Sequence, residues 1–186
     1  MNSLFQAGLE LQRFMEKKNW RFCFIGGLAL IRWGGVRMTQ DIDLSLLTGF
    51  GNEERFIKGL LKNFQSRIQD ASDFAFANRV LLLSASNGVP VDISLSGLPF
   101  EELMIKQATL FKYAPECLLR TCSAENLVVL KAFADRPIDW VDIESIVMRQ
   151  GKSLDCKYIV KQLAPLCKIK ESPEIIEKFN RVIEGL

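Results

Sequence analysis

Histidine is absent from this chain of 186 residues. Catalysis by a Ser-His-Asp or Cys-His arrangement, and zinc binding through histidine, are therefore excluded. The sequence also has no apolar stretch of the roughly 20 residues that a membrane-spanning helix requires. Its first residues show no basic start followed by an apolar run, so we expect neither a signal peptide nor a role at a membrane.

Cysteine is present but shows no CxxC pair, and its number, five, is odd. The thiols lie in apolar or helical contexts, at Cys23, Cys117, Cys122, Cys156 and Cys167. Such cysteines indicate reduced, buried thiols, so we expect a cytoplasmic protein. The formal net charge is +2, which is too small to indicate a nucleic-acid partner by itself.

Hydrophobic periodicity divides the chain into an α/β part and a helical part. The patterns predict strands over residues 21–25, 42–47, 79–84 and 89–94. After about residue 120 helix start signals dominate. We therefore expect an α+β fold with a mixed, mainly antiparallel sheet of four or five strands and a helical C-terminal part. The expected parts are residues 1–120 and 121–186.

Gly26-Gly27 separates the first predicted strand from a helical segment at 28–33. A glycine turn at the start of a helix exposes backbone N–H groups, which attract anions. It also lacks the side chains that would keep a phosphate away from the backbone. The same pattern arises where tight packing requires glycine, so both interpretations are open at this point.

Asp41 and Asp43 stand two residues apart at a predicted strand. Both carboxylates should then lie on one face, while Ile42 and Leu44 point into the core. Two neighbouring carboxylates repel unless a cation lies between them, and Mg²⁺ takes oxygen ligands together with substrate phosphates. The alternative is an ordinary solvent-exposed strand edge.

Asp92 projects from the polar face of the strand predicted at 89–94, opposite the apolar side chains of Val91 and Ile93. Next to the strand of Asp43, it would bring a third carboxylate to the metal and could accept the proton of an attacking hydroxyl. Two-metal sites stabilise both oxygens of an in-line displacement at phosphorus. Alternatively, Asp92 is a solvent-facing strand residue.

In this order the motifs resemble the polymerase-β-like nucleotidyltransferase superfamily, and within it the AbiEii-type abortive-infection toxins. The pattern of those toxins reads GG-x-A and then R-x-T-x-D-I-D-L. The matching residues here are Gly26, Gly27, Ala29, Arg37, Thr39, Asp41, Ile42, Asp43 and Leu44. The likeness covers about residues 20–45 and extends to Asp92. Many relatives have Gly-Ser in place of Gly26-Gly27, so a hydroxyl contact to phosphate is missing here.

The resemblance implies a nucleotidyltransferase core at 1–120 and a helical part at 121–186 that completes the active-site cleft. It further implies that Asp41, Asp43 and Asp92 bind two Mg²⁺ ions and that the glycine turn holds the triphosphate. Arg37 would steer the triphosphate or pair with Asp41. Thr39 would hold the loop before the strand through local hydrogen bonds.

A downstream segment resembles the family less closely. Lys131 on a predicted helix would contact the NTP phosphates, with Arg136 and Asp139 in supporting roles. The family often has lysine directly before the acid that matches Asp139, and this chain has Ile138 there. The alternative for this segment is an exposed helix with ordinary charge pairs.

The implied reaction transfers NMP from an NTP such as ATP to an acceptor hydroxyl, on tRNA or protein. The resemblance also implies a toxin–antitoxin component with an antitoxin or accessory partner. A small-molecule acceptor like an aminoglycoside is a second interpretation. A non-catalytic nucleotide- or protein-binding module of the same fold is a third, although three retained carboxylates argue against it.

Overall fold

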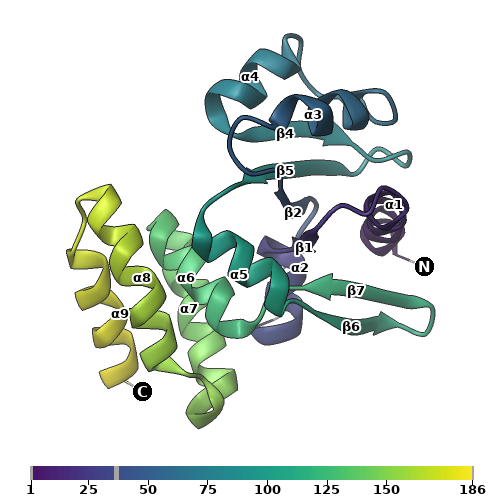
Figure 1. The fold of residues 1–186 in the computed structure, drawn as a ribbon. Coiled ribbons are helices and arrows are strands. Elements are labelled where there is room, and N and C mark those ends of the chain that lie inside the picture. Colours follow the sequence, from purple (N-terminus) through teal and green to yellow (C-terminus); the bar gives the residue numbers. More distant parts are fainter. Residues whose placement is uncertain (1, 36–37, 186) are drawn as a thin grey trace. The chain divides into compact units, whose positions relative to one another are not determined.

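A computed structural model describes residues 2–35 and 38–185 (Figure 1). The helices in these ranges are α1 (Ser3–Lys17), α2 (Gly26–Trp33), α3 (Glu53–Leu61), α4 (Ala71–Asn78), α5 (Pro99–Gln107), α6 (Ala124–Ala134), α7 (Pro137–Gln150), α8 (Cys156–Lys170) and α9 (Glu174–Glu184), with a 3₁₀ turn η1 (Gly151–Ser153). The strands are β1 (Phe22–Phe24), β2 (Ile42–Leu47), β3 (Gln65–Ser66), β4 (Val80–Ser84), β5 (Pro90–Ser96), β6 (Thr109–Ala114) and β7 (Cys117–Thr121). No helix in the described residues is long and apolar enough to cross a membrane.

The strands of the described residues form one mixed sheet in the order β3-β4-β5-β2-β1-β7-β6. The pairs β1–β2, β3–β4, β4–β5 and β6–β7 are antiparallel, and β1–β7 and β2–β5 are parallel. The predicted α+β fold, with a mainly antiparallel sheet and a helical C-terminal part, is confirmed. The expected four or five strands were too few, because the sheet has seven in the part of the chain that the structure describes.

One face of the sheet carries a hydrophobic core. Ile42 and Leu44 of β2, and Val91 and Ile93 of β5, are fully buried on this face. Helix α1 packs its apolar stripe there, with Leu11 at the centre. Full burial of each such side chain contributes about 1.5–3 kcal/mol, which fixes the register of both strands. The alternating positions of β2 and β5 therefore face the other side of the sheet.

The antiparallel pair β4–β5 is the hairpin that the Asn-Gly signal predicts. Gly88 has a φ of +83°, in the left-handed region, and its N–H donates to the carbonyl of Ala85 at 2.9 Å. The Asn87 side chain accepts a hydrogen bond from the N–H of Val89 at 3.3 Å. The turn thus sets the register that places Asp92 opposite Leu82.

Strands β3, β6 and β7 are absent from the sequence-based prediction. Most residues of β6 are exposed, so this edge strand shows no alternation of buried and exposed positions. Strand β7 does alternate, with Cys117, Leu119 and Thr121 buried, and the Pro115-Glu116 turn before it was the available signal. Strand β3 has two residues and carries no periodicity.

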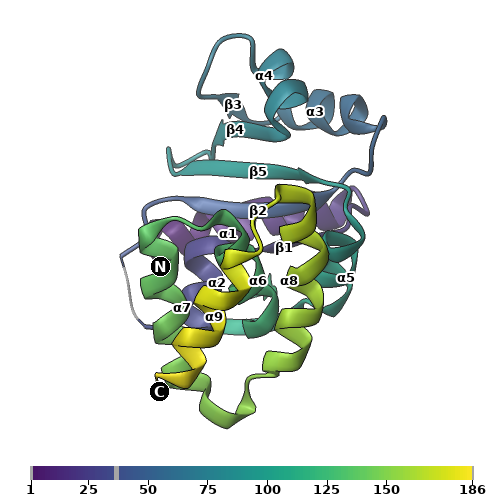
Figure 2. The same cartoon turned by 90° about the vertical axis from the view of Figure 1, so that its left-hand side faces the viewer.

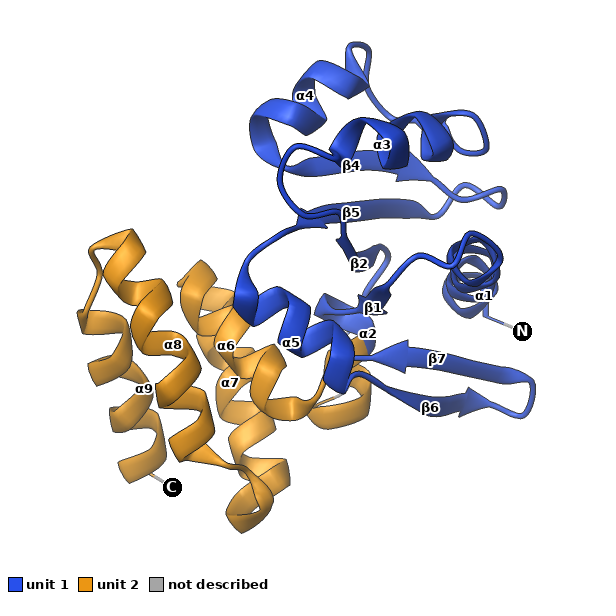
Figure 3. Cartoon of the chain, viewed as in Figure 1, with its two compact units in different colours: residues 1–28, 38–122 blue, residues 29–37, 123–186 orange. Residues whose placement is uncertain are grey.

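The chain divides into two compact units (Figure 3). The first contains residues 1–28 and 38–122, and the second contains residues 29–37 and 123–186. In the second unit α6 packs against α7, α8 and α9, and α8 also packs against α9 (Figure 2). The last residues of α2 belong to this helical unit although they precede the sheet strands β2 to β7 in sequence.

Candidate active site

Asp43 and Asp92 lie side by side on the polar face of the sheet. Strands β2 and β5 are parallel, and their register pairs Asp43 directly with Asp92. Register partners of neighbouring strands point to the same side of a sheet. Both carboxylates are partly exposed, in contrast to the buried residues on either side of them in each strand. The sheet therefore brings two of the predicted carboxylates together.

Asp41 stands just before β2 and is exposed. The Thr39 hydroxyl donates a hydrogen bond to the Asp41 carboxylate at 2.8 Å. Asp41 is close enough to Asp92 for its charge to act on that carboxyl group. Thr39 thus orients the third predicted carboxylate toward the same end of β2 and β5.

The glycine turn, Gly26-Gly27, lies against these carboxylates on the polar face of the sheet. Gly26 has a φ of +53°, and a Cβ there would overlap the Asp43 carboxylate. A Cβ on Gly27 would lie 2.6 Å from the Cβ of Thr39 and would overlap its hydroxyl. The two glycines are therefore required by the close approach of Asp43 and Thr39. The backbone N–H groups at the start of α2 are consequently next to the carboxylates, where a bound phosphate group would sit well.

Asp92 also forms an ion pair with Arg67, which the sequence-based prediction missed. Burial raises the pKa of Asp92, the Arg67 guanidinium partly offsets this, and the charge of Asp41 raises it again. The pKa of Asp92 therefore lies above its usual value. A carboxylate with a raised pKa is a stronger proton acceptor when ionised. No sequence signal marked Arg67, because it follows the two-residue strand β3.

The donor set of Asp41, Asp43 and Asp92 fits a hard divalent cation in chemical type, because each supplies carboxylate oxygens. The register of β2 and β5 also places Asp43 and Asp92 next to each other, as two ligands of one cation would need to be. Within residues 2–35 and 38–185, however, no three acidic or thiol side chains are already arranged around one ion position. Asp92 is in addition paired with Arg67.

Lys131, on α6, lies in the helical unit and belongs to a separate buried cluster. Its ammonium donates to Asp139 at 3.0 Å and to Asp142 at 2.6 Å, and only 7% of the residue is exposed. The predicted contact of Lys131 with NTP phosphates stays a prediction. Asp142 is a partner that the predicted site did not include.

Arg136 adds a second cation to this cluster. Its guanidinium donates to both carboxylate oxygens of Asp139, at 2.6 and 3.2 Å. Burial raises the pKa of Asp139, but the hydrogen bonds from Arg136 and Lys131 outweigh burial, so the pKa lies below its usual value. With Asp142, the cluster holds two positive and two negative side chains in close contact.

The structure thus sorts the predicted site residues into two groups. The first unit brings together Gly26, Gly27, Thr39, Asp41, Asp43 and Asp92. The second unit holds Lys131, Arg136 and Asp139. Arg37 lies outside the described residues, so its predicted role is untested.

Several solved structures have a similar fold. The antibiotic-resistance factor ANT(2'')-Ia has a TM-score of 0.54 at 17% identity, over 90% of this chain and 92% of that one. An antigenic nucleotidyltransferase-like protein from Paracoccidioides brasiliensis has a TM-score of 0.51 at 15% identity, over 94% and 90%. The lincosamide antibiotic adenylyltransferase LnuA, bound to lincomycin, has a TM-score of 0.51 at 13% identity, over 76% and 94%. At these identities the likeness establishes the fold.

Sequence comparison identifies the family more narrowly. No curated protein matches the chain. Residues 11–153 match the family described as "Nucleotidyl transferase AbiEii toxin, Type IV TA system". The match includes the glycine turn, all three carboxylates and the Lys131 cluster. The chain therefore belongs to the AbiEii nucleotidyltransferase toxin family.

Proposed function

We propose that this chain transfers a nucleoside monophosphate from an NTP to an acceptor hydroxyl and uses magnesium to do so. One observation carries the proposal: carboxylates gather at the start of α2. Asp43 lies against Gly26 and shares a register position with Asp92, and Asp41 is within electrostatic reach of Asp92. Family membership and the fold of the structural neighbours support the same reaction class.

In the proposed reaction the acceptor oxygen forms a bond to the α-phosphorus of the NTP. The bond between that phosphorus and the oxygen bridging to the β-phosphate breaks, and pyrophosphate leaves. Asp92 accepts the proton of the hydroxyl. The N–H groups of Gly26 and Gly27 bind phosphate oxygens at the start of α2. Asp41, Asp43 and Asp92 would hold two Mg²⁺ ions, which neutralise charge on the attacking and leaving oxygens.

The remaining predicted residues have supporting roles in this proposal. Arg37 would bind the triphosphate as a bidentate donor. Lys131 would reach a phosphate only by exchanging one of its two carboxylate partners, while Asp139 and Arg136 stay paired. That the helical part completes the cleft around the NTP stays a prediction.

The acceptor is proposed to be RNA, such as a tRNA end, or a protein hydroxyl. The family description names a toxin of a type IV toxin–antitoxin system, so we expect a cognate antitoxin. The five free cysteines are consistent with action in the reducing cytoplasm.

The test incubates the purified protein with each α-³²P-labelled NTP, Mg²⁺ and total cellular RNA. Asp41→Asn and Asp43→Asn should lose the label on RNA or on the protein itself while keeping the thermal unfolding curve of a folded chain. Asp73→Asn is the matched control, because Asp73 is an exposed aspartate on α4. It should label like the parent protein.

Other outcomes separate the alternatives. An Asp41→Asn variant that labels at the parent rate would rule out the proposed mechanism. Metal-dependent NTP binding without label on any macromolecule would instead favour a binding module or a small-molecule acceptor. Adding aminoglycosides and lincosamides to the assay distinguishes those two.

A further inference from the structure

Arg67 lies on the polar face of the sheet, in a row with the carboxylates. Its backbone N–H donates to the carbonyl of Leu82 at 3.1 Å, which extends the β3–β4 pairing by one residue. Leu82 is the register partner of Asp92, and Asp92 is the register partner of Asp43. Arg67, Leu82, Asp92 and Asp43 therefore follow one another across neighbouring strands, and Figure 2 shows β3, β4, β5 and β2 in this order.

The side chain of Arg67 spans the strand between it and Asp92. Two strand spacings amount to about 9–10 Å, which a long arginine side chain can bridge. Leu82, only partly buried, lies under this path, and the guanidinium ends on the Asp92 carboxylate. Side-chain exposure is 31% for Arg67 and 38% for Asp92, so solvent screens this pair only in part.

The ion pair between Arg67 and Asp92 changes the net charge around the three carboxylates on the polar face of the sheet. Asp41, Asp43 and Asp92 carry three negative charges close together, and Asp41 acts electrostatically on Asp92. Arg67 supplies a positive charge at Asp92. A divalent cation that uses the same carboxylate would meet that positive charge at short range, where like charges repel strongly. Arg67 and a metal ion therefore compete for Asp92.

We propose that Arg67 is the positioning residue that sets the metal affinity of this site, because it occupies Asp92 until a divalent cation displaces it. The inference rests on the proposed function, since it takes Asp92 as a metal ligand. Loss of Arg67 should make metal binding tighter, although the substitution removes an ion pair.

The direct test measures Mn²⁺ binding to the purified protein without nucleotide, from the electron paramagnetic resonance signal of free Mn²⁺. Arg67→Gln should bind Mn²⁺ about two- to fivefold more tightly, the range expected when a partly exposed pair no longer has to be broken. Arg67→Lys keeps the charge and should stay nearer to the parent value. Asp92→Asn should weaken binding.

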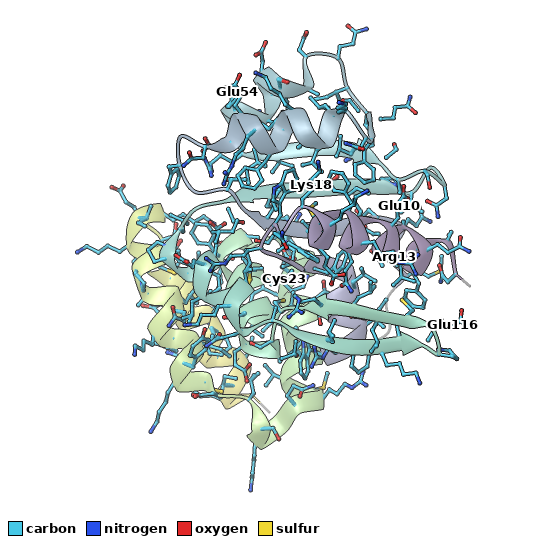
Figure 4. The ribbon with its side chains drawn as sticks, turned by 45° about the vertical axis from the view of Figure 1, so that its right-hand side comes forward. Glu10, Arg13, Lys18, Cys23, Glu54 and Glu116 are labelled. Carbon is cyan, nitrogen blue, oxygen red and sulfur yellow. The ribbon has the colours of Figure 1, made fainter. Side chains whose placement is uncertain are left out.

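Two controls isolate the effect. Arg13→Gln makes the same change in charge on α1, which packs on the opposite, apolar face of the sheet (Figure 4), and should leave Mn²⁺ affinity unchanged. In an Asp92→Asn background, Arg67→Gln should have no further effect, because the contested carboxylate is gone. An equal increase in Mn²⁺ affinity in the Arg13 and Arg67 variants would show a general effect of net charge and overturn the proposal.

Thermal unfolding provides a second readout that a purely structural ion pair would not produce. Metal-free Arg67→Gln should melt below the parent protein, and saturating Mg²⁺ should raise its Tm more than that of the parent. If the Tm of Arg67→Gln lies below that of the parent by the same amount at every Mg²⁺ concentration, and its Mn²⁺ affinity is unchanged, the inference is overturned. The proposed function stays intact in that case. No Mn²⁺ binding by the parent or by Arg67→Gln would overturn the inference, whereas the proposed function, in which NTP phosphates complete the metal sites, is decided by the labelling assay.

Discussion

At the scale of single residues, the glycine turn illustrates how side chains of a site determine the backbone beside it. Gly27 needs no unusual φ, so its requirement comes from the space taken by Thr39. Thr39 is in turn the hydrogen-bond donor that orients Asp41. A change at position 27 should therefore act on Asp41 through Thr39.

We predict that Gly27→Ala lowers the free energy of unfolding by about 1–3 kcal/mol, the usual cost of inserting a methyl group into a filled space. Nucleotidyl transfer should fall with it, because Thr39 must move away from Asp41. Urea unfolding of a double-mutant cycle with Thr39→Gly tests the cause. Removing the Thr39 side chain should recover part of the stability lost at position 27, whereas additive losses would contradict the contact.

Asp139 is a buried carboxylate whose contribution to stability should depend on pH. Its pKa in the folded chain lies below the value of about 3.9 for an unfolded aspartate. The ionised carboxylate therefore adds stability above about pH 4, and this stability is lost as pH falls through the lowered folded-state pKa. We predict that Asp139→Asn destabilises the protein at pH 7 by about 3 kcal/mol, at the low end for a broken buried pair because Lys131 keeps Asp142.

Unfolding curves from pH 7 down to pH 3 measure this dependence. The difference between parent and Asp139→Asn should shrink on the acid side of pH 4, as the parent carboxyl group becomes protonated. The exposed Asp73→Asn variant should show no such convergence. If the difference in unfolding free energy between parent and Asp139→Asn stays constant down to pH 3, the hydrogen-bond geometry of Asp139, and not its charge, provides the stability.

At the scale of elements, the strands and turns that could be predicted are those with a strong local sequence pattern. The β4–β5 hairpin and β2 could be predicted because turn chemistry and alternation agree there with the final packing. The same alternation placed Asp43 and Asp92 on a polar face before their register was known. Their pairing as parallel neighbours is a long-range contact that no local pattern encodes. Arg67 could not be predicted for the same reason, since its role depends on crossing the strand between it and Asp92.

The β4–β5 turn provides a prediction at this scale. Gly88 has a φ of +83°, and a Cβ on it would meet no atom within 4 Å. Gly88→Ala should therefore cost about 1 kcal/mol from the left-handed backbone conformation alone. Gly88→Asn should cost less, because asparagine tolerates this conformation better. Chemical denaturation can rank the three proteins, and equal stability of the alanine variant and the parent would contradict the expected strain.

At the scale of the whole molecule, the units do not follow the order of the chain. Residues 29–35 belong to the helical unit and pack with a helix that lies more than a hundred residues later in the sequence. Gln150 donates to the carbonyl of Trp33 at 2.7 Å, and Arg149 donates to the carbonyl of Gly34 at 2.5 Å. The Ser145 hydroxyl accepts from the N–H of Gly35 at 3.2 Å. Stability of α7 should therefore depend on residues near the start of the sequence.

Adjacent glycines allow this dependence to be tested in the intact chain. A Cβ on Gly34 would lie 2.6 Å from the end of the Leu30 side chain, 2.8 Å from the Ser145 hydroxyl oxygen and 3.1 Å from the side chain of Ile146. One on Gly35 would lie 3.6 Å from Ser145, an ordinary contact. We predict that Gly34→Ala, and not Gly35→Ala, speeds amide hydrogen exchange along α7, because the packed segment must shift. The strands β4 and β5 should keep their protection in both variants. Faster exchange in those strands, with α7 unchanged, would show that residues 29–35 support the sheet unit and not the helical one.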